Sequence, residues 1–254
     1  MKWERVSGPL ESLVFPAQCH GCDINLDPSR QVGFPYLCEA CAKKIIPIEG
    51  NFCDRCGQSF EGDLPTEFEC SNCRGLELHF DFARGACLGT TLSRDLVHGL
   101  KYRGSIHLAR PLAKLLLQNL SDPRIGPGPW WIVPVPLHRR RLKTRGFNQA
   151  EEIARQFTRQ APAECEFKLW SGLRRVRATP RQAQLDRSAR LSNLAGAFAL
   201  RRRRFPSQAW PKEGDSFILV DDVITTGATL SHCAEVLRTA FQPERLIALG
   251  ALRG

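Results

Sequence analysis

The chain has 254 residues, of which 43% are hydrophobic and 24% charged, a composition that excludes a disordered or fibrous protein. No apolar run approaches the roughly 20 residues that cross a bilayer, and residues 1–16 lack the uninterrupted apolar stretch of a secretory signal. We therefore expect a cytoplasmic protein that does not insert into membranes.

Charge is divided unevenly along the chain. Residues 1–80 carry a net charge of −5 and the remainder carries +15, within a total of +10. This change in composition predicts one domain over 1–79 and a second over 80–254. The basic second part favours an anionic partner, either a phosphorylated small molecule or nucleic acid, although a solvated charged surface has the same composition.

Eight of the eleven cysteines form four Cys-x-x-Cys pairs before residue 75. The pairs are Cys19 and Cys22, Cys38 and Cys41, Cys53 and Cys56, and Cys70 and Cys73. Fifteen residues separate the first two pairs and thirteen separate the last two, a spacing by which two turns place four thiolates around one Zn²⁺. We predict a double zinc ribbon with two structural sites, for which sequential pairing is favoured over interleaved pairing.

A disulfide framework is the alternative for these cysteines. A reducing cytoplasm disfavours it, and the three remaining cysteines, Cys87, Cys165 and Cys233, are an odd set. The first 75 residues have little apolar core, so metal binding would supply folding free energy on the order of 10 kcal/mol per site. His20 could be a ligand, but with eight thiolates present we expect it to be a turn residue.

Strands and helices alternate from Phe80 onward. The expected order is a strand or hairpin over 80–91, helices over 92–100 and 105–120, a strand over 130–136, a helix over 148–157, a strand over 217–220, a helix ending at Phe241 and a strand over 245–252. Such alternation predicts an α/β fold with a parallel sheet flanked by helices. Residues 163–212 are poorly periodic and rich in arginine, so we expect an irregular hood or cap outside the central sheet.

Two adjacent acids, Asp221 and Asp222, follow the strand over 217–220 and precede the loop Thr225-Thr226-Gly227-Ala228-Thr229. Ligands of parallel sheets bind beyond the carboxyl ends of strands, where paired carboxylates can accept hydrogen bonds from ribose hydroxyls. The unpaired N–H groups of a helix start, threonine hydroxyls and a permissive glycine suit a phosphate. The stretch predicts a sugar 5′-phosphate site, whereas an ordinary capped turn accounts for only one acid and one threonine.

The stretch over 218–229 resembles the phosphoribosyl-pyrophosphate (PRPP) signature of type I phosphoribosyltransferases. With the zinc ribbons before it, the chain resembles the ComF/GntX family, in which a double zinc ribbon precedes a phosphoribosyltransferase-like domain. The blocks over 98–104, 133–150 and 175–198 also look like this family, so the resemblance covers nearly the whole chain.

The resemblance implies a role for each block. Asp221 and Asp222 would hold the ribose hydroxyls, with Mg²⁺ bridging sugar and pyrophosphate, and residues 225–229 would cradle the 5′-phosphate. A mobile basic segment over 139–145, including Arg145, would close on the diphosphate. A short pyrophosphate-binding loop would be formed by Lys101, Tyr102, Arg103 and Gly104. The catalytic candidates are Asp221, Asp222 and Lys101.

The resemblance leaves the acceptor open. A hood within 174–198 would read it, and its arginines and amides suit an anionic acceptor or a nucleic-acid backbone as well as they suit a plain surface subdomain. The family favours an association with DNA uptake in natural transformation, with single-stranded DNA or DNA-processing proteins as candidate partners. The two classes of function are a PRPP-dependent transferase and a non-catalytic factor that senses PRPP or handles nucleic acid.

Overall fold

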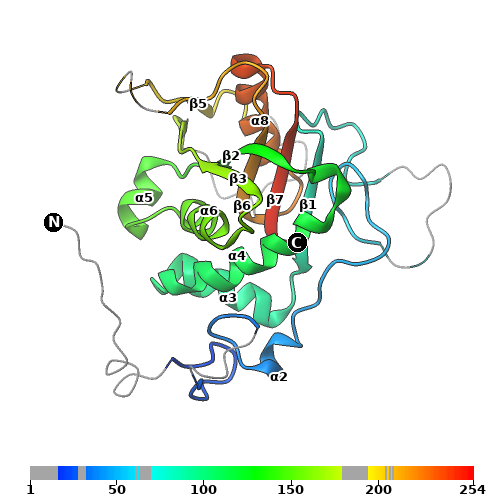
Figure 1. Ribbon diagram of the computed structural model, residues 1–254, viewed down its shortest axis with the longest axis vertical. Helices are drawn as coiled ribbons and strands as arrows, with labels where there is room; N and C mark the ends of the chain where they lie inside the picture. Colours follow the sequence, from blue (N-terminus) through cyan, green and yellow to red (C-terminus); the bar gives the residue numbers. More distant parts are fainter. Residues whose placement is uncertain are drawn as a thin grey trace.

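The computed structural model describes residues 17–27, 33–60, 62, 70–178, 194–203, 205, 207 and 209–254. Five parallel strands form the central sheet in the order β1-β7-β6-β2-β3 (Figure 1). They are β1 (Phe82–Leu88), β2 (Gly128–Pro134), β3 (Cys165–Leu169), β6 (Phe217–Ile224) and β7 (Leu246–Arg253). The predicted parallel α/β fold behind a cysteine-rich ribbon is confirmed.

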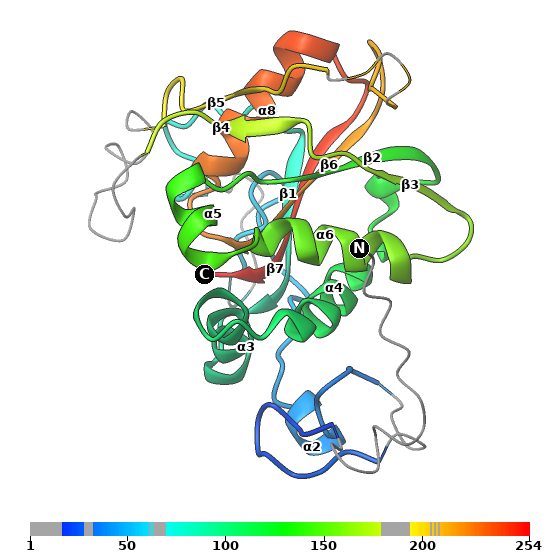
Figure 2. The same cartoon turned by 90° about the vertical axis from the view of Figure 1, so that its left-hand side faces the viewer.

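Helices cover both faces of the sheet (Figure 2). On one face lie α3 (Thr91–Tyr102), α4 (Ala109–Gln118) and α6 (Gln149–Gln160), and on the other lies α8 (Ala228–Phe241). The shorter elements are α2 (Glu39–Ala42), α5 (Arg139–Arg145), the 3₁₀ turns η2 (Ile106–Leu108), η3 (Asn119–Ser121) and η4 (Pro123–Ile125), and the antiparallel pair β4 (Leu173–Arg175) and β5 (Phe198–Leu200).

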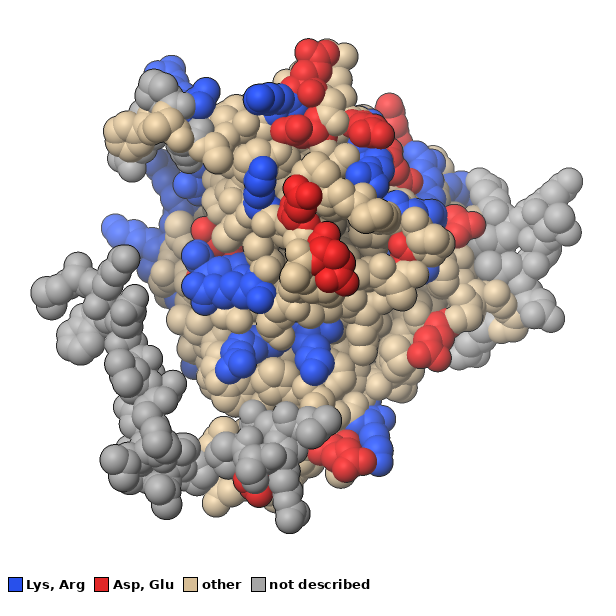
Figure 3. Space-filling view, viewed as in Figure 1, with Lys and Arg blue, Asp and Glu red and all other residues tan. Residues whose placement is uncertain are grey.

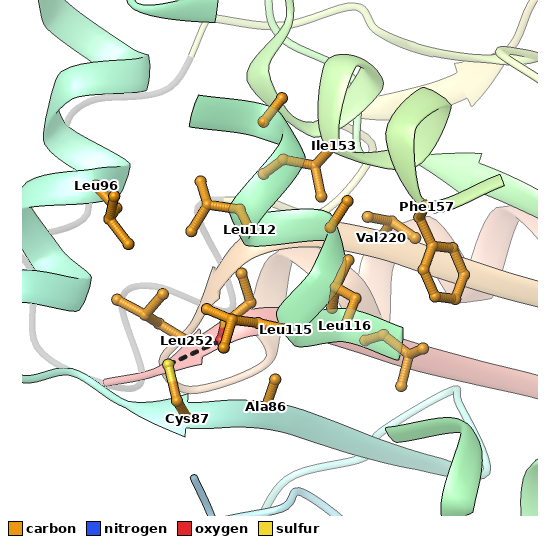
Figure 4. Close-up of a cluster of buried hydrophobic side chains, with 14 of the residues drawn as sticks. Ala86, Cys87, Leu96, Leu112, Leu115, Leu116, Ile153, Phe157, Val220 and Leu252 are labelled. Atoms are coloured by element: carbon orange, nitrogen blue, oxygen red, sulfur yellow. Dashed lines mark hydrogen bonds between the residues drawn. The ribbon is translucent and has the colours of Figure 1, made fainter. Parts of the chain in front are cut away.

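The apolar stripes expected from helical periodicity form the two cores. Figure 4 shows Leu112, Leu115 and Leu116 of α4 beside Ile153 and Phe157 of α6. Buried apolar residues of the predicted helices include Leu96, Val97, Leu100, Leu108, Leu112, Leu115, Leu116, Ala150, Ile153, Ala154, Phe157, Leu230, Cys233, Ala234, Leu237 and Phe241. Alternate residues of β6 reach opposite cores, so this strand is apolar on both sides, as expected of a strand inside a parallel sheet.

The two halves of the ribbon pack on opposite faces of the sheet. Cys19 and Cys41 belong to the core under α3 and α4, whereas Cys53 and Cys56 belong to the core under α8. The chain between them, over 46–48, pairs with the outer edge of β1: Ile48 N–H donates to Ala86 O at 3.2 Å and Leu88 N–H to Ile46 O at 2.9 Å. This pairing covers an edge that would otherwise leave backbone groups unsatisfied.

Several expectations are wrong in detail. The segment over 80–91 forms one strand, not a hairpin. Residues 165–169, expected outside the sheet, form its edge strand β3, because their alternating pattern places Phe167 against Phe157 with ring centroids 5.2 Å apart. The domain boundary near residue 80 stays a prediction.

Other expectations fall partly or wholly outside what the structure describes. Much of the expected hood, residues 179–193, lies outside the described residues. Across the described ranges, no helix is both long enough and apolar enough to span a bilayer.

Leu112 is fully buried between α6 and the sheet, so Leu112→Ala should lower the free energy of unfolding by about 2–5 kcal/mol. Gln118→Ala, at an exposed position of the same helix, should change it by less than about 0.5 kcal/mol. Equilibrium urea unfolding of both variants checks this difference, and equal losses would contradict the assignment of the core.

Candidate functional site

The eight paired cysteines form two separate clusters. They are Cys19, Cys22, Cys38 and Cys41 in the first and Cys53, Cys56, Cys70 and Cys73 in the second, and within each cluster all sulfur atoms lie within 4.8 Å of one another. Sequential pairing is therefore confirmed. Each cluster supplies four sulfurs, which fill the tetrahedral coordination of one Zn²⁺ and leave no coordination position for water or a substrate.

The sulfur geometry suits zinc and excludes disulfides. The Sγ atoms of Cys22 and Cys38 are 3.7 Å apart, as are those of Cys53 and Cys73. Tetrahedral coordination with Zn–S bonds of about 2.3 Å requires sulfurs about 3.8 Å apart, whereas a disulfide requires about 2.0 Å. His20 stands outside the first cluster, because its Nε2 lies 2.9 Å from Asp95 Oδ2 on α3.

The twin acids lie in β6 and not beyond its end, which corrects the sequence-based expectation. Strand β2 stops at Pro134, opposite Val220, whereas β6 continues to Ile224 and still pairs with β7. Asp221 and Asp222 therefore project past the carboxyl end of β2, the edge at which parallel sheets bind ligands. Figure 2 shows α3 and α5 on two sides of this edge.

A cleft of about 710 Å³ opens at this edge. Seven of the predicted residues line it: Lys101, Tyr102, Gly104, Arg145, Asp221, Asp222 and Thr229. Arg140, Arg141 and Thr144 of the predicted basic segment and Arg175 of the expected hood also line it. The structure adds Val135, Pro136, Leu137, Phe147 and Gln149. Arg103 is not among the lining residues, since its Nη2 lies 3.2 Å from Asp95 Oδ1 on the same helix. Residues 225–228 follow β6 directly but are also absent from the lining.

Lys101 brings a cation into contact with the twin acids. It stands in the last turn of α3, with Nζ 2.6 Å from Asp222 Oδ2, and both side chains are largely buried. Burial alone would lower the pKa of Lys101, but the attraction and hydrogen bond of Asp222, together with the smaller effects of Asp221 and Tyr102, raise it overall. This ion pair joins two predicted site residues that are far apart in the sequence.

Asp221 is the less compensated of the two acids. Burial, followed by repulsion from Asp222, raises the pKa of Asp221 to about 8. Its Oδ1 accepts a hydrogen bond from Asp222 N–H at 2.9 Å. At neutral pH Asp221 is therefore mostly protonated.

The loop after β6 has the backbone predicted for it. Gly227 adopts φ +80°, a left-handed conformation that favours glycine, and α8 begins at Ala228. Thr226 Oγ1 accepts from Ala228 N–H at 3.4 Å. The first turn of α8 thus starts directly beside the cleft, where Thr229 reaches the lining.

The segment Arg145-Gly146-Phe147-Asn148-Gln149 joins two helices across the cleft. Gly146, at φ +84°, ends α5, and Asn148 caps α6 by accepting from Ala150 N–H at 3.2 Å. Gln149 Oε1 accepts a hydrogen bond from Arg145 Nη1, and the Arg145 guanidinium lies 5.4 Å from the Tyr102 ring centroid. Residues 139–145 form the helix α5, and their predicted closure on the diphosphate stays a prediction.

Sequence reasoning did not single out Gln149 or the apolar wall over 135–137. The signal for both was present in the block over 133–150, whose glutamine and prolines had no assigned role. Gln149 is buried, and its side-chain oxygen holds the Arg145 guanidinium at the cleft.

Comparisons with known proteins agree with this architecture. The double zinc ribbon domain family matches residues 10–74. "DNA utilization protein YhgH" of Salmonella typhi is 36% identical over 229 residues, covering 89% of this chain and 92% of that protein. "Competence protein F" of Haemophilus influenzae is 29% identical over 231 residues, covering 88% of this chain and 92% of that protein. "Competence protein ComFC" of Bacillus subtilis is 25% identical over 208 residues, covering 79% of this chain and 77% of that protein.

Fold and metal clusters together define a double zinc ribbon protein with a parallel α/β domain. The identity to its relatives, extending over most of both chains, shows that the chain belongs to the ComF family.

Metal analysis of the purified protein should return about two zinc ions per chain. Replacing Cys53 and Cys56 by serine should leave about one, because the first cluster is independent of the second. A zinc-free protein with oxidised thiols would contradict the ribbon assignment.

Asp222→Asn should lower the pKa of Asp221, because it removes the adjacent charge. A carbon-13 NMR titration of the aspartate carboxyls measures this. Because the raised pKa keeps Asp221 protonated in the folded state only, the free energy of unfolding should fall as pH rises from about 4 to about 8. Asp221→Asn should reduce this slope, whereas Glu213→Gln, at an exposed position, should not.

Proposed function

We propose that the cleft binds PRPP together with Mg²⁺. One observation carries the proposal: Asp221 and Asp222 project past the end of β2, with Lys101 on Asp222 and a left-handed Gly227 opening α8 beside them. A carboxylate pair next to a cation and a helix start supplies acceptors for sugar hydroxyls and donors for phosphates in one place. The resemblance of residues 218–229 to the PRPP signature supports the same ligand.

Different residues of the cleft and loop would bind the ribose, the 5′-phosphate and the diphosphate of PRPP. Asp221 and Asp222 would accept hydrogen bonds from the ribose hydroxyls, and the N–H groups and hydroxyls over 225–229 would bind the 5′-phosphate. Lys101 and Arg145 would bind the diphosphate through charge-assisted hydrogen bonds. Arg103 turns away to Asp95, so its part in the loop would be to fix the end of α3.

The donor set also suits the metal ion. Mg²⁺ prefers oxygen ligands and is usually held by one or two carboxylates together with substrate phosphates, which is the combination that this cleft and PRPP would offer. When bound, it would neutralise charge on the diphosphate. Asp221 would release its proton as the cation enters, since a cation nearby favours the carboxylate form.

If the protein is a transferase, its residues act on the departure of pyrophosphate. The sugar carbon gains positive charge as the bond to the diphosphate lengthens, and the carboxylates of Asp221 and Asp222 would stabilise that charge. Lys101 and Arg145 would stabilise the leaving group on its other side. A fixed arrangement of these groups lowers the reorganisation needed at the moment of reaction.

We also propose a role in DNA uptake or use, which rests on the names that the relatives bear. The second candidate activity is binding of single-stranded nucleic acid. It is favoured by the exposed basic residues of α5, and Figure 3 shows Lys and Arg gathered on the side where Figure 1 places that helix. Such binding should weaken steeply with salt, whereas PRPP binding should depend on Mg²⁺.

Titration calorimetry of the zinc-loaded protein with PRPP should show binding only when Mg²⁺ is present. Asp221→Asn combined with Asp222→Asn should weaken that binding at least about 100-fold, because two charge-assisted hydrogen-bond acceptors are lost. The control Glu213→Gln removes an exposed carboxylate and should bind as the unaltered protein does. Unchanged affinity in the double variant would contradict the site.

Pyrophosphate release then separates the two classes of function. The protein is incubated with Mg²⁺, PRPP and a panel of bases, nucleotides and single-stranded DNA. Release with one acceptor identifies a transferase and its substrate. Binding without release identifies a PRPP-sensing protein.

A further inference from the structure

We propose that Arg253 is a positioning residue that ties the second zinc cluster to the phosphate loop over 225–229. The inference deepens the proposed function and rests on it for the ligand, but the contact itself stands on the structure alone. Arg253 belongs to neither the cleft lining nor the cysteine cluster. It lies between them, at the end of β7.

The guanidinium of Arg253 is buried, with 3% of the residue exposed. Its Nη1 donates to Ile224 O at 2.9 Å and also to Thr225 O, and these two carbonyls end β6 and begin the loop. Its Nη2 contacts Cys56 Sγ at 3.9 Å. One guanidinium thus contacts both a predicted zinc-ligating sulfur and the backbone at which the loop leaves β6.

Charge explains why a cation is stable there. Among the residues that the structure describes, Arg253 forms no ion pair with an Asp or Glu side chain, although its Nη1 also donates to Gly254 O at 3.0 Å. A buried guanidinium without a nearby negative charge is costly. A Zn²⁺ ion with four thiolate ligands is a dianion, so the second cluster supplies the missing negative charge. The backbone carbonyls of the loop supply the remaining acceptors.

The chain that leaves the second cluster also lies directly under the loop. A Cβ atom on Gly227 would come within 3.4 Å of the Phe80 ring, so loop and chain are in close contact. Ser231, in the first turn of α8, accepts from His79 N–H at 3.1 Å and donates to Glu77 O at 3.2 Å. The chain after the second cluster therefore contacts the loop at Gly227 and the first turn of α8 at Ser231, and Arg253 adds a charged contact from β7.

Planar donors explain why arginine suits the position. A guanidinium can reach two carbonyls and a sulfur at once because its N–H groups point in fixed directions, whereas a lysine ammonium is a single point on a flexible stem. Arg253 would set the direction in which residues 225–229 leave β6. The spacing between the loop amides and the ribose site would follow from that direction.

The test compares Arg253→Met and Arg253→Lys with Arg124→Met in zinc-loaded protein. Arg124 is the matched control: its Nη1 donates to Asp54 O at 3.0 Å, so it also joins the second ribbon to the α/β domain, but it does not touch the loop. Zinc content, thermal stability, PRPP affinity with Mg²⁺ and backbone hydrogen exchange over 224–230 are measured for each.

Arg253→Met should raise hydrogen exchange over 224–230 and weaken PRPP binding about tenfold or more, with Arg253→Lys intermediate. Arg124→Met should lower thermal stability but leave exchange in the loop and PRPP affinity unchanged. If Arg253→Met loses zinc or fails to fold, Arg253→Lys decides, since it keeps the charge beside Cys56. The proposal would be overturned if the folded Arg253 variant showed unchanged hydrogen exchange over 224–230 and unchanged PRPP affinity. It would also be overturned if Arg124→Met changed both quantities as much as the Arg253 variant does.

Hydrogen exchange without PRPP keeps this test separate from the proposed function. If the unaltered protein fails to bind PRPP but Arg253→Met still loosens residues 224–230, the ligand assignment fails and the structural link stands. If PRPP binds but Arg253→Met leaves hydrogen exchange over 224–230 unchanged, the ligand assignment stands and the structural link fails.

A spectroscopic readout follows from the reciprocity of coupled sites. With Co²⁺ in place of Zn²⁺, the thiolate-to-metal absorption bands should shift when Mg²⁺ and PRPP are added to the unaltered protein, because Arg253 contacts Cys56 and the loop together. The shift should be absent in the folded Arg253 variant and retained in Arg124→Met. Absorption bands that do not shift when PRPP binds to the unaltered protein would contradict the link.

Discussion

The difference in length between two neighbouring strands determines the site. Because β2 ends at Pro134 while β6 runs on to Ile224, Asp221 and Asp222 have no strand beside them on one side and face a cleft. The resulting pair of adjacent carboxylates is electrostatically costly, and Lys101 offsets part of that cost through its contact with Asp222. The remaining cost raises the pKa of Asp221 to about 8.

The ribbons extend this arrangement to the rest of the chain. The first half of the ribbon meets α3 through His20 and Asp95, and Asp95 also holds Arg103 at the end of that helix, next to Lys101. The second half meets β6 and α8 on the opposite face of the sheet. A small metal-stabilised module therefore contacts the supports of both sides of the cleft, so zinc contributes to the fold at the place where the proposed ligand would bind.

Local patterns predicted those features that depend on local physics. The four Cys-x-x-Cys pairs gave both clusters, since a short turn fixes where two sulfurs point. Helical stripes such as Leu112 to Leu116 gave the core, and the glycine in the loop gave its left-handed turn. Strand β3 escaped notice because a five-residue edge strand with alternating charge has a weak signal. The contacts of Lys101 with Asp222 and of Arg253 with Cys56 join residues far apart in sequence, and no periodicity reports them.

The account therefore depends on what the twin carboxylates of β6 hold. A crystal structure of the zinc-loaded protein grown with Mg²⁺ and PRPP tests this most directly. The account predicts density for a ribose with its hydroxyls on Asp221 and Asp222, its 5′-phosphate over residues 225–229 and its diphosphate toward Lys101. An empty cleft at saturating ligand, or a ligand bound away from β6 with Lys101 still on Asp222, would contradict it.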